Sequence, residues 1–100
     1  MIARTWHGVV PREKSEEYYN YLKKTGIADY AKIKGNLGIQ ILKKDYHSET
    51  HFLVISFWIS IQAIKEFTGE NYNVARYYKK DKHYLSTFET VHHYEVLMQT

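Results

Sequence analysis

The chain has 100 residues, of which 44% are hydrophobic and 25% charged, with one Pro and no Cys. This length predicts a single domain, residues 1–100, and the composition excludes an intrinsically disordered chain. The lack of Cys excludes disulfides, thiolate catalysis and thiolate metal sites. The net charge of +3 is mildly basic, and Asp81 interrupts the lysines between positions 79 and 82, so we expect solvated turns there and no nucleic-acid partner.

The longest apolar run, "FLVISFWI", has the length of a strand and is too short to cross a bilayer. The first residues, "MIARTWHGVV", contain no apolar segment of the kind found in signal peptides. We therefore expect a cytoplasmic protein with no membrane partner.

Aromatic residues are unusually frequent, with ten Tyr and two Trp. Their large apolar area and polar edge suit wet cavities, subunit interfaces and surfaces that stack RNA bases.

The first half of the chain predicts a strand, a helix and a second strand. Residues 2–10 form the first strand, which Pro11 ends. A helix over residues 12–25 follows, and Gly26 is placed as its C-cap. One face of this helix carries an apolar stripe: Tyr18, Tyr21, Leu22 and Thr25.

The second strand, residues 37–44, and the third, residues 51–59, flank the polar turn "DYHSET" and predict a hairpin. Ser60 is a candidate N-cap for a helix over 61–67, which Gly69 ends.

The segment "NYNVARYY" predicts a short helical turn that points Val74, Ala75 and Tyr78 inward, and residues 88–98 predict a last strand. The order is β-α-β-β-α-β. It predicts a ferredoxin-like α+β fold, with a four-stranded antiparallel sheet and both helices on one face.

Alternation divides the third strand into two faces. The wholly apolar set, which we assign to the helix side, is Leu53, Ile55, Phe57 and Ile59. The opposite set is also largely apolar and has no helix left to cover it: Phe52, Val54, Ser56 and Trp58. A second copy of the chain is the simplest cover, which predicts a homodimeric α+β barrel with Trp58 at the wall of a cavity. In the last strand His92 and His93 point to opposite faces, and alternation does not decide which faces the cavity.

Three segments, "SFWISIQAIKEFTGEN", "ARYYKKDKHYL" and "VHHYEV", resemble the antibiotic biosynthesis monooxygenase-like family, and the likeness extends over nearly the whole chain. The resemblance implies a small homodimeric α+β barrel. Characterised members include enzymes that oxidise anthrone- or quinol-like molecules with dioxygen and no metal, flavin or other cofactor. That chemistry needs an apolar pocket, groups that orient and deprotonate the substrate, and exclusion of water.

A second branch of the same superfamily cleaves haem with an Asn on the first strand, a Trp at a strand end and an axial His on a later helix. Trp58 matches that Trp. Arg76 or Tyr77 stands where the His is expected, and the first strand has Thr5 and Trp6 in place of Asn. The resemblance therefore disfavours haem degradation, and no cofactor is expected.

Seven residues are the candidates for the site. Two are assigned to catalysis, His93 as a base or orienting group and Trp58 as a pocket wall. The others are assigned to substrate binding: Arg4, Trp6, Arg76, Tyr77 and Tyr78. For each of them packing or ion pairing within the fold remains the alternative, and a buried Arg4 would need a partner. The two His residues in "HSETH" have the spacing of a metal-binding motif, but they lie in a predicted turn and not in a helix, so no metal site is expected.

Two functions remain open for a small apolar or aromatic ligand. One is a cofactor-independent monooxygenase, and the other is a non-catalytic dimeric domain that binds the ligand. An RNA-recognition domain has the same element order, but the third strand lacks the basic-glycine start of that motif.

Overall fold

A computed structural model describes residues 1–100 and contains a four-stranded antiparallel sheet with the strand order β2-β3-β1-β4. The strands are β1 (Ile2–Pro11), β2 (Asn36–Tyr46), β3 (Glu49–Trp58) and β4 (His92–Glu95). The helices are α1 (Ser15–Leu22), α2 (Ala28–Ala31) and α3 (Ile61–Thr68). This order and topology confirm the predicted ferredoxin-like α+β fold.

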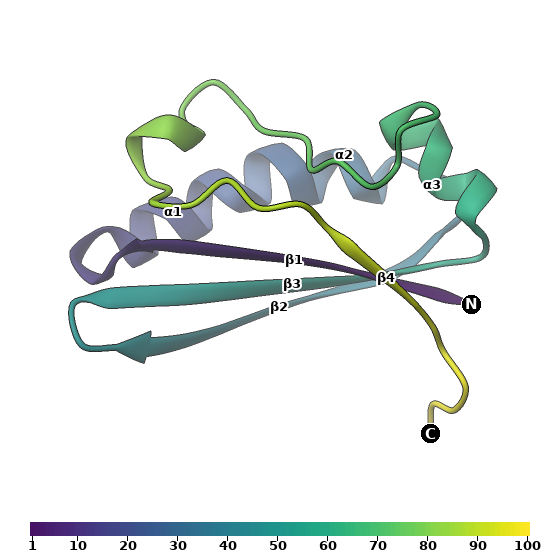
Figure 1. Ribbon diagram of the computed structural model, residues 1–100, viewed down its shortest axis with the longest axis horizontal. Helices are drawn as coiled ribbons and strands as arrows, with labels where there is room; N and C mark the ends of the chain where they lie inside the picture. Colours follow the sequence, from purple (N-terminus) through teal and green to yellow (C-terminus); the bar gives the residue numbers. More distant parts are fainter.

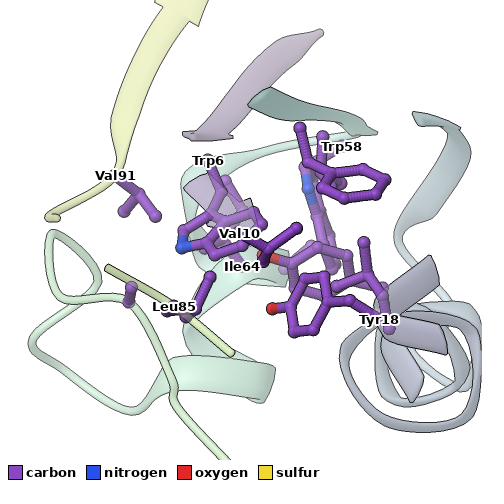
Figure 2. Packing of buried hydrophobic residues seen from close by; sticks show 13 residues of the cluster. Trp6, Val10, Tyr18, Trp58, Ile64, Leu85 and Val91 are labelled. Atoms are coloured by element: carbon purple, nitrogen blue, oxygen red, sulfur yellow. The ribbon is translucent and has the colours of Figure 1, made fainter. Parts of the chain in front are cut away.

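The helices and the long segment between α3 and β4 lie together on one side of the sheet (Figure 1). The buried core lies between these two layers and is rich in aromatic rings. Figure 2 shows Trp58 on one side of this cluster, with Leu85 and Val91 on the other. The opposite face of the sheet is not covered by any element of the chain, and we call it the open face.

The two faces of β3 are the reverse of those assigned from the sequence. Phe52, Val54 and Trp58 are buried on the helix side, whereas Leu53 and Ile59 are exposed. Both sets are apolar, so alternation does not decide which set faces the helices. The buried set contains Ser56, which made it the more polar of the two sets. The Ser56 hydroxyl is fully buried, where it accepts a hydrogen bond from the Trp58 indole at 2.8 Å.

The first helical segment is longer than predicted and does not end at Gly26. A π-helical turn, Lys23–Ile27, links α1 directly to α2. Gly in a helix costs about 1 kcal/mol relative to Ala. The continued helix buries Tyr30 against Trp58 and Phe67, which offsets that cost.

The helix predicted over residues 61–67 is α3 and follows the prediction closely. The Ser60 hydroxyl accepts a hydrogen bond from the backbone N–H of Ala63 at 3.1 Å, so Ser60 is the N-cap of α3. Gly69 ends the helix with a φ of 78°, in the left-handed region that suits glycine.

The region after α3 differs from the prediction. Residues 71–78 form no helical turn, the Val74 side chain is 50% exposed, and a short 3-10 turn occurs later, at Asp81–His83. The predicted last strand shortens to His92–Glu95, because residues 86–91 run irregularly beside β1. None of the helices has the length and hydrophobicity that a membrane-spanning segment needs.

Candidate functional site

A narrow cavity lies between the helix side of the sheet and the helical layer. Its volume is about 40 Å³. Its floor is formed by Trp6 from β1 and Val54 from β3. Its other walls come from the first helical segment, α3 and the segment before β4: Tyr18, Leu22, Thr25, Gly26, Ile27, Tyr30, Phe67, Ala75, Arg76, Tyr77, Tyr78, Asp81 and Val91. The lining is mostly apolar and aromatic, as in pockets for flat organic ligands.

Gly8 fixes the position of the Trp6 ring at the floor of the cavity. A Cβ atom on Gly8 would lie 2.3 Å from the Trp6 Cη2 atom, closer than carbon atoms can approach. The absence of a side chain at this position therefore lets the Trp6 ring lie flat along its own strand, beneath the cavity.

Asp81 is the only acidic side chain that lines the cavity, and it is 4% exposed. Its Oδ1 atom accepts a hydrogen bond from the Tyr18 hydroxyl at 3.1 Å, and its Oδ2 atom accepts one from the Tyr78 backbone N–H at 2.5 Å. Each carboxylate oxygen has a second lone pair, so Asp81 can also accept a hydrogen bond from a ligand.

Three of the tyrosine hydroxyls that line the cavity, those of Tyr18, Tyr77 and Tyr78, remain protonated at neutral pH. Burial, followed by the charge of Asp81, raises the pKa of the Tyr18 phenol far above its ordinary value. Burial and the hydrogen bond to Asp29 at 2.5 Å raise the pKa of Tyr78 as well. Burial also raises the pKa of Tyr77, whose hydroxyl donates to the Glu89 carbonyl at 2.6 Å. Each hydroxyl already donates its single proton within the fold, so it can accept a hydrogen bond from a ligand but cannot remove a proton from it.

Of the predicted binding residues, Trp6, Arg76, Tyr77 and Tyr78 line the cavity. Trp6 and Tyr77 contact each other, because the Trp6 indole donates to the Tyr77 hydroxyl at 3.3 Å. Arg76 is exposed and stacks on the Phe67 and Tyr78 rings, which places it at the rim.

Trp58 does not line the cavity. Its side chain is fully buried, and its ring packs edge-on against Tyr30 with the centroids 5.3 Å apart. Trp58 therefore packs in the core, one layer behind the cavity wall. Packing within the fold was the alternative to the predicted role of pocket wall.

Arg4 and His93 lie together outside the cavity, on the helix side of β1 and β4. Arg4 is 1% exposed and has no carboxylate partner. It donates to the Tyr30 hydroxyl at 2.9 Å and to the Tyr72 and Val74 carbonyls at 2.7 and 3.4 Å. Its Nη1 atom is 3.0 Å from His93 Nε2. Because a guanidinium can only donate, His93 Nε2 accepts this hydrogen bond, and its lone pair is not free to take a proton from a ligand.

Sequence reasoning missed Asp81 and Tyr18 as site residues. Asp81 was interpreted as a break in a solvated lysine cluster, and Tyr18 as one residue of an apolar helix stripe. Asp81 does lie within "ARYYKKDKHYL", one of the segments that carry the resemblance to the family, and this was the available signal for it.

His93 makes the fold sensitive to acid. Burial, with the nearby charges of Arg4 and His92, lowers the pKa of His93 to about 4 from 6.5. Between these two values the unfolded chain binds the extra proton and the folded chain does not, so the free energy of unfolding decreases as the pH falls through this range. We expect His93→Gln to lessen this decrease, as measured by urea unfolding at a series of pH values. The same substitution at the exposed His83 is the control, and equal pH dependence in the two variants would contradict the assignment.

Comparison with known proteins supports the fold alone. No family model matches the sequence, and no curated protein matches it. A proposed antibiotic biosynthesis monooxygenase from Bacillus cereus is 18% identical, with a TM-score of 0.71, and the match covers 100% of this chain and 94% of that one. A single-site mutant of MhuD, with two manganese protoporphyrin IX bound per active site, is 16% identical, with a TM-score of 0.66 and coverage of 100% and 98%. The chain therefore has the fold of the antibiotic biosynthesis monooxygenase-like proteins that its sequence resembles.

Proposed function

We propose that this protein is a cofactor-independent monooxygenase that oxidises a small aromatic or quinol-like molecule with dioxygen in the cavity beside Asp81. The observation that supports this most directly is a single buried carboxylate in a pocket lined mostly by aromatic and aliphatic side chains. Such a lining suits a flat ring, and the cavity walls must move apart to admit one. The closed pocket then excludes water and offers one acceptor for a phenolic proton.

In this proposal the substrate hydroxyl donates to Asp81 and then transfers its proton to the carboxylate. The electron-rich phenolate reduces dioxygen by one electron, and the substrate radical and superoxide combine into a carbon–oxygen bond. Loss of water from the resulting peroxide leaves a carbonyl, so a CH₂ group and O₂ become C=O and H₂O. The chain binds and orients the ring, excludes solvent and accepts the proton.

The residues present do not fit haem. No histidine lines the cavity, and His93 is hydrogen-bonded to Arg4 outside it. The hydroxyls of Tyr18, Tyr77 and Tyr78 donate to Asp81, Glu89 and Asp29. No imidazole is therefore offered to an iron, and the proposal contains no step through a porphyrin.

We propose further that the protein is a homodimer in which the open faces of two sheets pack together. On this face Leu42, Leu53, Ile55, Phe57 and Tyr94 form an apolar surface across β2, β3 and β4, as their cross-strand register requires. Leu42 is 44% and Tyr94 58% exposed. Exposed apolar area of this kind is typical of subunit interfaces.

Asp81→Asn is expected to lower kcat/KM for a phenolic substrate by about 100-fold or more, because it removes the proton acceptor. Oxygen uptake with a panel of anthrones and hydroquinones measures this effect, and circular dichroism checks the fold. Tyr18→Phe keeps the carboxylate and is expected to have a smaller effect. Asp45→Asn, at the β2–β3 hairpin, is the matched control.

Wild-type turnover in Asp81→Asn would contradict the assigned role. Saturable ligand binding with no oxygen uptake in the wild type would instead indicate the non-catalytic binding domain.

Ile55→Glu is expected to convert the dimer into a folded monomer, because it places a charge at the centre of the open face. Light scattering on a sizing column should change from twice 12.0 kDa to 12.0 kDa. Val74→Glu changes an exposed side chain on the other side of the sheet and should leave the dimer intact. A dimeric Ile55→Glu protein would contradict the proposed interface.

A further inference from the structure

A chain of hydrogen-bonded titratable groups crosses the open face, away from the cavity. The Glu89 carboxylate lies 2.8 Å from His7 Nδ1, and His7 Nε2 lies 2.9 Å from His51 Nδ1. His51 Nε2 in turn faces Glu49 Oε1 at 3.7 Å. We call His7 and His51, with Glu89 and Glu49 at the two ends, the histidine chain. Neither histidine has a role in the proposed reaction.

The two imidazole rings meet head-on. Their planes differ by 28°, and their centroids are 5.2 Å apart. The nitrogens are 2.9 Å apart, so the centroid distance exceeds the nitrogen distance by about two ring radii. The two nitrogens therefore point at each other along the line between the rings. They suit a shared proton and do not converge on a common metal position, and no group of three or more metal-binding side chains forms anywhere in the chain.

The histidine chain limits how many protons the pair can hold. Glu89 holds a proton on His7 Nδ1, which leaves His7 Nε2 as an acceptor for the His51 Nδ1–H. A first added proton enters at His51 Nε2, facing Glu49, and keeps the chain intact. A second would place N–H groups on both nitrogens of the 2.9 Å contact, which then repel each other. The pair can carry one positive charge as a chain, but not two.

The surroundings of the pair come from several strands. Lys44 of β2 lies opposite His51 in the register, and Glu49 faces His51 from its own strand. His92 of β4 is on the same face, beside Thr5. Burial raises the pKa of Glu89, but the hydrogen bonds from Thr87 and His7 outweigh it and lower that pKa below its ordinary value. Glu89 therefore stays ionised.

We propose that the histidine chain makes docking of a second copy on the open face depend on pH. The proposal rests on the homodimer proposed above, since His7 lies directly opposite Leu53 in the register. Near neutral pH the chain is intact, and the 2.9 Å contact satisfies both facing nitrogens. In acid the second proton breaks the His7–His51 contact and leaves two N–H groups next to the apolar surface without an acceptor. Burying donors that have no acceptor in an interface is costly, so the dimer dissociates.

The test is the dimer dissociation constant, measured by sedimentation at about pH 7.5 and about pH 5, the second well below the ordinary imidazole pKa because the pair resists its second proton. We expect an increase of about tenfold or more in the wild type, because proton uptake is linked to dissociation. The double variant His7→Gln, His51→Gln should change far less, and the control His92→Gln should follow the wild type. Near-ultraviolet circular dichroism verifies that the fold persists at both pH values.

Each outcome addresses one claim. A dimer with the same dissociation constant at both pH values, or equal pH dependence in the wild type and the double variant, overturns the histidine chain as a switch and leaves the dimer standing. A monomer at both pH values contradicts the homodimer itself. If the double variant does not fold, Glu89→Gln serves instead. It removes the anion that stabilises His7 as a cation, so dissociation should move to lower pH, and an unchanged midpoint would overturn the proposal.

Discussion

The buried guanidinium of Arg4 joins more elements of this fold than any other polar group. From β1 it binds the Tyr30 hydroxyl of α2, the Tyr72 and Val74 carbonyls of the segment after α3, and His93 of β4. All these acceptors are neutral, so the charge is stabilised by hydrogen bonds alone, at the low exposure of 1%. Residues 71–78 are non-helical, and two of their carbonyls, those of Tyr72 and Val74, accept hydrogen bonds from Arg4.

This constraint shapes the cavity. With Tyr72 and Val74 held against β1, the following residues Ala75 to Asp81 pass over the floor made by Trp6, and Asp81 reaches the Tyr18 hydroxyl. The polar group that the proposed chemistry needs is therefore positioned by a contact that is itself outside the cavity. The aromatic richness of the sequence is used in the same place, since rings from β1, the first helical segment and this segment form the walls.

The sequence was sufficient for the order of elements, the hairpin, the N-cap at Ser60 and the helix end at Gly69, because each depends on local chemistry. The sequence could not show which face of β3 packs against the helices, because both sets of residues are apolar. Ser56 argued against its own set, and only the structure shows that the Trp58 indole satisfies its hydroxyl in the core. Trp6, Tyr77 and Tyr78 were predicted in the site, and they line it. Asp81 was missed because its burial depends on long-range contacts that composition and periodicity do not record.

In the proposed function a flat aromatic ligand binds between the sheet and the helices, and not on the open face. Methyl NMR spectra recorded during titration with a hydroquinone test it directly. Binding in the cavity is expected to shift the signals of Val54, Ile27 and Val91, which line it, and to leave those of Leu53 and Ile55 unchanged. Shifts confined to Leu53 and Ile55 would place the ligand on the open face and contradict the account.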